Sequence, residues 1–169
     1  MNLLFTDKTG TITKGQLEVV DFITGDLKEY LSFDQLPVPI REMTYENVVL
    51  NTSAAVAEGA IVGGNITERA LTRYIGDYRK LQMPLRNTFV PFNSATKYSF
   101  AGVQGASAYT LAKGAPEKLL QYCDYYWDEK GHCLPFTEAM KQALDEKMVE
   151  LAGRAIRMLA LCTFPKSVY

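Results

Sequence analysis

Runs of apolar residues separated by polar, turn-forming residues predict most of the strands of this chain. The runs are short and rich in β-branched and aromatic residues, a composition typical of strands with at least one buried face. Turn signals at Asn93-Ser94 and Gln104-Gly105 separate three of them, which favours an antiparallel meander. The expected strands are residues 3–6, 14–24, 87–92, 97–103, 108–112 and 156–164.

Apolar residues recur at helical spacing in four segments between these strands. Thr44 can cap the first helix, and Pro116 suits the first turn of the third. Residues 25–43 are polar and contain Pro37 and Pro39, so we expect a variable loop or a short helix there. The expected helices run over residues 44–58, onward from residue 65, over 116–123 and over 137–152.

The order of these elements predicts an α+β fold with an antiparallel β-sheet flanked by helices. Hairpin strands and helices occur without the strand–helix–strand rhythm of a parallel sheet. A further hairpin is expected from residues 125–127 and 132–134. His132, the only histidine of the chain, lies beside its tip, where we expect it to be solvated.

Composition places the chain among soluble globular proteins. Its 169 residues are 47% hydrophobic and 22% charged, which suits one ordinary domain with a packed core. No apolar run approaches the ~18 residues needed to cross a bilayer, and the first residues lack the basic region of a signal peptide. We therefore expect a chain that does not span a membrane. The net charge of −1 gives no general attraction to nucleic acid, so we expect no nucleic-acid partner, and a bound anion needs a local pocket.

The cysteines and the histidine form no metal-binding or disulfide pattern. Cys123, Cys133 and Cys162 match no zinc spacing, and their odd number argues against a disulfide framework. We expect reduced thiols, buried or half-buried, in a reducing compartment. A single histidine excludes a multi-histidine metal site.

The segment after the first predicted strand carries the most specific chemical signal. Asp7 follows an apolar strand, and the small or polar residues Lys8-Thr9-Gly10-Thr11 follow Asp7. A carboxylate held at the end of a buried strand suits a nucleophile that accepts a phosphoryl group, and small residues let main-chain N–H groups approach a phosphate. An ordinary Asp-initiated turn explains the same pattern, so the spacing alone leaves both interpretations open.

Residues 5–13, Phe-Thr-Asp-Lys-Thr-Gly-Thr-Ile-Thr, resemble the phosphorylation motif of P-type ATPases, the ion pumps that pass through an aspartyl-phosphate. The resemblance continues in the family's order along essentially the whole chain. It implies that Asp7, Lys8 and Thr9 are catalytic, with Asp7 as the nucleophile. It also implies that Asp7 and the Thr9 carbonyl bind Mg²⁺. Residues 1–13 are then the edge of the phosphorylation domain, and residues 14–169 are the nucleotide-binding domain.

Four later segments resemble the ATP-binding motifs of the same family. They are Gly64–Leu71, Pro91–Lys97, the Lys-Gly-Ala-Pro-Glu stretch at 113–117, and Arg154–Ala160. The resemblance implies a carboxylate near the adenine amino group, an aromatic ring stacked on adenine, and a glycine where the backbone comes near the ligand. It also implies lysines that line the pocket and an arginine at the phosphates. The implied residues are Glu68 for the carboxylate, Phe92 for the aromatic ring, Gly114 for the glycine, Lys97 and Lys113 for the lysines, and Arg157 for the arginine.

Four of these residues, Glu68, Phe92, Lys97 and Lys113, also have a plain structural interpretation. Asn65 and Glu68 stand three positions apart at a helix start, which is a capping-box arrangement. Phe92 is a typical core residue, and the two lysines are typical of a solvated surface. These alternatives stay open on the sequence alone.

The resemblance predicts an ATP-binding domain of a cation-transporting P-type ATPase, closest to the calcium and sodium–potassium pumps. It implies a cytoplasmic domain of an integral membrane protein. ATP and Mg²⁺ are its expected ligands, and its partners are the phosphorylation, actuator and transmembrane domains of the same pump. We expect the chain alone to bind ATP weakly and to lack efficient self-phosphorylation.

Two alternatives belong to other functional classes. One is an aspartate-nucleophile phosphatase of the haloacid dehalogenase superfamily, which is disfavoured because Thr9 stands where a second acid is needed. The other is a non-enzymatic interaction domain, in which the pocket would be incidental.

Overall fold

The computed structural model describes residues 2–6 and 17–165. Within them, seven strands form one sheet in the order β3-β2-β1-β11-β8-β7-β6, and each neighbouring pair is antiparallel. This confirms the predicted α+β class. The strands are β1 (Asn2–Thr6), β2 (Val19–Thr24), β3 (Glu29–Tyr30), β6 (Leu85–Val90), β7 (Tyr98–Gln104), β8 (Ala108–Gly114) and β11 (Arg157–Phe164).

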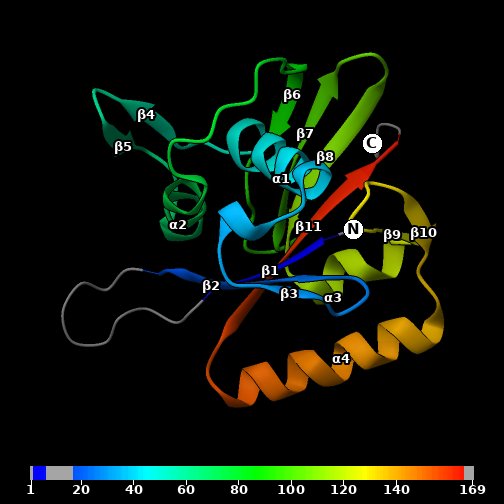
Figure 1. The fold of residues 1–169 in the computed structure, drawn as a ribbon. Coiled ribbons are helices and arrows are strands. Elements are labelled where there is room, and N and C mark those ends of the chain that lie inside the picture. The colour runs from blue at the N-terminus through cyan, green and yellow to red at the C-terminus, as the bar shows by residue number, and fades with distance from the viewer. Residues whose placement is uncertain (1, 7–16, 166–169) are drawn as a thin grey trace.

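Helices cover both faces of this sheet (Figure 1). Side chains alternate along β11, so Ala160 and Cys162 pack with Leu144 of α4 in one core, while Leu161 packs with Ile40 of α1 in the other. The helices are α1 (Val38–Leu50), α2 (Ile66–Ile75), α3 (Pro116–Leu119) and α4 (Glu138–Gly153), with 3₁₀ turns η1 (Phe33–Gln35) and η2 (Leu120–Tyr122).

The helix expected over residues 44–58 was placed wrongly at both ends. Helix α1 begins at Val38, with Pro37 at the N-cap, and Thr44 is buried in its middle instead of capping it. Proline is tolerated in a first helical turn because the backbone N–H that it lacks would have no partner within the helix there, so Pro37 and Pro39 mark a helix start and not a loop.

The residues after α1 form a two-stranded hairpin of β4 (Ala55–Ala57) and β5 (Ala60–Val62). Its turn residues Glu58 and Gly59 have φ of 53° and 78°, the left-handed region that tight two-residue hairpins require. The turn chemistry of a Glu-Gly pair therefore outweighs the helical propensity of the alanines around it.

Other predicted boundaries are confirmed by their caps. The Asn65 side chain accepts a hydrogen bond from the Glu68 N–H and the Glu68 side chain accepts one from the Asn65 N–H, so α2 begins with a complete capping box. Thr137 caps α4 by accepting from the Met140 N–H. The hairpin of β9 (Tyr125–Trp127) and β10 (Cys133–Pro135) is also formed as predicted.

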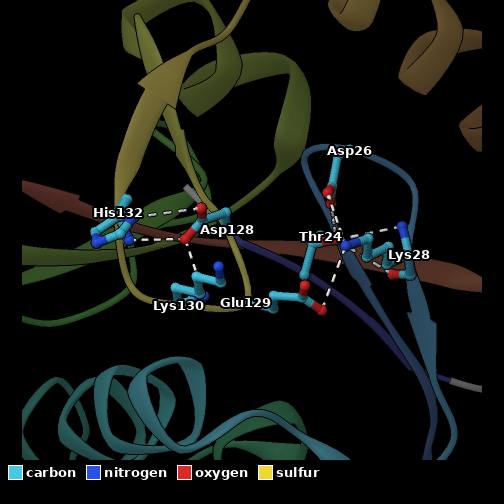
Figure 2. A network of polar contacts seen from close by, with 7 residues as sticks. All are labelled: Thr24, Asp26, Lys28, Asp128, Glu129, Lys130 and His132. Carbon is cyan, nitrogen blue, oxygen red and sulfur yellow. Dashed lines mark hydrogen bonds and ion pairs between the residues drawn. The ribbon is translucent and has the colours of Figure 1, made fainter.

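The tip of this second hairpin touches the turn between β2 and β3 (Figure 2). The Asp128 carboxylate accepts from the N–H groups of Lys130 at 2.9 Å and His132 at 2.8 Å, which fixes the turn. Glu129 forms an ion pair with Lys28, with 3.4 Å between Glu129 Oε2 and Lys28 Nζ. The His132 side chain is 69% exposed, which confirms the predicted solvated histidine.

Buried polar side chains in α1 and at its C-cap tie this helix to the sheet. The Asn47 side chain donates to the Ala112 carbonyl at 2.9 Å, and the Asn51 side chain donates to the Ser99 carbonyl at 3.2 Å. Glu46, 2% exposed, pairs with Lys80 and accepts from the Tyr109 hydroxyl. These contacts fix α1 against β7 and β8.

Strand β1 is a central strand, paired with β2 on one side and β11 on the other. Thr6, its last residue, is opposite Arg157 at the start of β11. The predicted division of the chain after residue 13 falls outside the described residues, so that boundary stays a prediction.

Candidate functional site

A cavity of about 610 Å³ opens where the N-terminus of α2, the segment between β6 and β7, the end of β8 and the start of β11 meet. Five residues predicted to bind ATP line it, although they are far apart in the sequence. The lining residues are Asn65, Thr67, Glu68, Phe92, Ser94, Lys97, Ser99, Lys113, Ala115, Pro116, Glu117, Arg157, Met158 and Leu159.

Lys113 is the most unusual of these residues. It lies near the end of β8, its exposed fraction is 4%, and its Nζ has no hydrogen-bond partner among the described residues. Burial lowers the pKa of Lys113 to about 8, although the nearby Glu68 opposes that shift. A buried, unpaired ammonium group is unfavourable, so an anion in the cavity would relieve a cost already present in the fold.

Glu68 lies in the cavity wall with an exposed fraction of 3%. Its Oε2 accepts from the Ser53 hydroxyl at 2.7 Å, the Ser53 N–H at 3.2 Å and the Asn65 N–H at 3.4 Å. The capping interpretation of Glu68 is therefore confirmed. The same carboxylate also borders the cavity, so its cap does not exclude a role toward a ligand.

Phe92 lies just beyond the end of β6 and is 45% exposed. This exposure is too large for the core residue that is its plain structural interpretation. A half-exposed aromatic ring in a cavity wall can accept a flat ring of a ligand at low entropic cost.

Lys97 ends the loop between β6 and β7 and is exposed. Its N–H donates to the Asn93 carbonyl at 2.6 Å, which closes the loop. Its φ of 67° is a left-handed conformation that costs energy for a residue with a side chain. This strained residue is one of those that line the cavity.

Gly114 is not among the lining residues, and its small size has a different explanation. A Cβ at this position would lie 2.4 Å from the Lys97 carbonyl oxygen and 2.6 Å from the Tyr98 Cα. Only glycine lets β8 approach β7 this closely. The structure explains Gly114 by strand packing, and its predicted approach to a ligand stays a prediction.

Arg157 opens β11, is exposed and borders the cavity, whereas the exposed Arg154 is not one of the lining residues. The choice of Arg157 over Arg154 therefore agrees with the geometry. Its planar guanidinium can bind phosphate oxygens in pairs.

Ser99 is a lining residue that the sequence analysis missed. It is fully buried, its hydroxyl has no hydrogen-bond partner among the described residues, and it pairs with Lys113 across β7 and β8. Its pairing with Lys113 across the two strands is what points to it, and that pairing is known only from the fold.

Asp7, Lys8 and Thr9 lie outside the described residues, so their predicted catalytic and metal-binding roles stay predictions. No group of three or more potential metal ligands occurs within residues 2–6 and 17–165. In the same ranges, every helix is too short or too polar to cross a membrane.

Comparison with known proteins identifies the family of the chain. A sequence model for the family "P-type ATPase, cytoplasmic domain N" matches residues 40–168. The calcium-transporting ATPase 8 of Arabidopsis thaliana, plasma membrane-type, is 31% identical over 169 residues, covering 92% of this chain and 16% of the relative. A calcium-transporting ATPase of Listeria monocytogenes is 30% identical over 170 residues, covering 94% of this chain and 19% of the relative.

The similarity extends to a second type of pump. The sodium/potassium-transporting ATPase subunit alpha-A of Artemia franciscana is 28% identical over 183 residues, covering 94% of this chain and 18% of the relative. The chain belongs to the P-type ATPase family, and the matched segment is its cytoplasmic domain N. The chain spans less than a fifth of the length of these three relatives.

Proposed function

We propose that this chain is the ATP-binding part of a cation-transporting P-type ATPase, an enzyme that couples ATP hydrolysis to ion transport. The family membership supports the class of protein. The observation that carries the binding site is the buried, unpartnered ammonium group of Lys113 in a cavity with Phe92. A polyanion with a flat aromatic ring satisfies both features at once.

In the proposed complex, adenine stacks on Phe92 and its amino group faces the Glu68 carboxylate. The phosphates face the cationic side chains Lys97, Lys113 and Arg157, which border the same cavity. The net charge of the chain is −1, so this local concentration of positive charge is what attracts the nucleotide. Stacking contributes roughly 1–3 kcal/mol, and exposed charge contacts contribute about 1 kcal/mol or less each. We therefore expect weak binding.

The chemical step belongs to Asp7, the proposed nucleophile for the γ-phosphate. Lys8 and Thr9 are proposed to contact the phosphoryl group, and Asp7 and Thr9 to hold Mg²⁺, which offsets phosphate charge when bound. The remaining phosphorylation, actuator and transmembrane domains are the proposed partners, in a cytoplasmic location on a membrane pump. Without them, the chain is proposed to bind ATP without turning it over efficiently.

Calorimetric titration with ATP and CTP tests this proposal on the 169-residue chain. We expect ATP to bind several-fold more tightly than CTP, because a purine stacks better on Phe92. Replacement of the hairpin-tip residue Lys130 by alanine is the control and should leave both affinities unchanged. Equal affinities for ATP and CTP would favour a non-enzymatic interaction domain with an incidental pocket.

A further inference from the structure

Two buried cysteines touch each other on the face of the sheet covered by α4. Cys123 follows η2 and is 5% exposed, and Cys162 in β11 is 2% exposed. Their Sγ atoms lie 3.6 Å apart, although the residues are 39 positions apart in the sequence. Both cysteines are free thiols. The fold therefore brings together two sulfur atoms that the sequence separates widely.

A second cavity borders this pair at Cys123. It has a volume of about 690 Å³, and its wall includes Cys123, the exposed Cys133 and the aromatic residues Tyr122 and Trp127. Cys162 is not among its lining residues and contacts Cys123 from the protein interior. An oxidant in this cavity therefore contacts Cys123 before Cys162. The thiol next to Cys123 is that of Cys162.

We propose that Cys123 and Cys162 form a reversible disulfide, with a hydroperoxide as the oxidant and the second cavity as its access route. The Cys123 thiolate attacks one peroxide oxygen, the O–O bond breaks, and hydroxide or alkoxide leaves, which gives a sulfenic acid on Cys123. The Cys162 sulfur then attacks the Cys123 sulfur, the S–O bond breaks, and water leaves with the Cys162 proton. Two thiols lose two electrons and two protons, and the peroxide is reduced.

The local electrostatics support this order of events. The hydrogen bond with Cys162 lowers the pKa of the Cys123 thiol, and the same contact, together with complete burial, raises the pKa of Cys162. Because the thiolate is the nucleophile, Cys123 is the thiol that reacts first. Lys141 on α4 adds a smaller favourable charge toward the Cys123 thiolate.

Peptide mapping after oxidation of the folded chain tests the proposal. The 169-residue chain is treated with hydrogen peroxide without denaturant, its remaining thiols are alkylated, and the digest is analysed by mass spectrometry. We expect Cys123 linked to Cys162 in most molecules, reversed by dithiothreitol. Recovery of both peptides in alkylated form, or a main link from Cys123 to Cys133, would overturn the proposal.

The same oxidation in strong denaturant is the matched control. In an unfolded chain, closing the short loop between Cys123 and Cys133 costs less entropy than closing the longer loop to Cys162. The preferred partner of Cys123 should therefore change from Cys162 in the folded chain to Cys133 in the unfolded one. An identical product ratio in both conditions would show that the fold does not direct the reaction.

A variant then isolates the proposed intermediate. In Cys162→Ser, the sulfenic acid on Cys123 has no resolving thiol at its side and should accumulate as an adduct with dimedone, several-fold above the unmodified chain. In Cys133→Ser, the Cys123–Cys162 link should form as in the unmodified chain. No dimedone adduct in the first variant, or no link in the second, would contradict the assignment.

Discussion

Ser99 and Lys113 are direct partners across β7 and β8, and each has a buried polar atom without a hydrogen-bond partner among the described residues. Both side chains border the cavity that Phe92 and Arg157 also line. Unpaired buried polar atoms cost free energy, and buried polar groups in folded proteins usually have a hydrogen-bond partner. In the proposed complex, a phosphate that accepts a hydrogen bond from the Lys113 ammonium group would relieve part of this cost.

Replacing Lys113 by methionine should weaken ATP binding about tenfold or more, since a charged hydrogen bond in a buried site contributes roughly 1.5–3 kcal/mol. Stability should not fall, because the variant also removes the cost of burying an unpaired charge. Calorimetric titration and urea unfolding check the two effects. Lys118→Met, at an exposed position of α3, is the control and should leave affinity unchanged. Unchanged ATP affinity in Lys113→Met would remove Lys113 from the site.

The lowered pKa of Lys113, about 8, predicts a dependence of stability on pH. Between pH 8 and the ordinary lysine value of 10.5, the unfolded chain holds a proton that the folded chain has released, so the contribution of Lys113 to stability rises with pH in this window. At neutral pH, burial of the protonated Lys113 side chain lowers the free energy of unfolding by about 3 kcal/mol. Urea unfolding midpoints of the unmodified chain and of Lys113→Met, each at pH 7 and pH 9.5, measure this pH dependence. A constant difference between the two proteins would contradict the prediction.

Replacing Phe92 by alanine should weaken ATP binding by roughly 1–3 kcal/mol and abolish the preference for ATP over CTP, because stacking is lost. The fold should persist, since the ring is already 45% exposed. Fluorescence competition between the two nucleotides is the measurement. The matched control is Tyr122→Ala, which removes an aromatic ring that is 64% exposed at the other cavity. Similar effects of both variants would argue against a stacking site at Phe92.

Replacing Glu46 by alanine should destabilise the fold by about 3 kcal/mol, because it leaves Lys80 and the Tyr109 hydroxyl without their buried partner. The ATP affinity of the folded fraction should stay unchanged, since Glu46 does not border the nucleotide cavity. Urea unfolding gives the free energy, and Glu129→Ala is the control. Glu129 is exposed and pairs with an exposed lysine, so its loss should cost less than about 1 kcal/mol.

The correct predictions concern caps and turns, which depend on residues close together in the chain. Three such features are found as expected: the helix caps at Asn65 and Thr137, and the hairpin tip around His132. Each depends on contacts between residues only a few positions apart. The error at α1 arose because a proline favours both loops and first helical turns, and sequence alone does not separate these roles. Burial of Thr44 inside α1 follows only from packing against the sheet.

The sequence named residues that the fold brings to one cavity, but it did not reveal their chemical environment. The family resemblance named Glu68, Phe92 and Lys113, and the fold brings them to one cavity. Two features depend on contacts between distant segments and had no signal in the sequence: the unpartnered Lys113 ammonium group and the approach of β7 that requires Gly114. Ser99 was missed because a serine in a strand is unremarkable until its cross-strand partner is known.

Mapping of backbone amide shifts during titration of the 169-residue chain with ATP tests the central claim most directly. The account predicts that the largest shifts gather at Phe92, Lys97, Lys113 and Arg157, which converge on one cavity from three separate segments. Shifts that gather instead around Tyr122 and Trp127 at the second cavity, or no shifts at millimolar ATP, would contradict it.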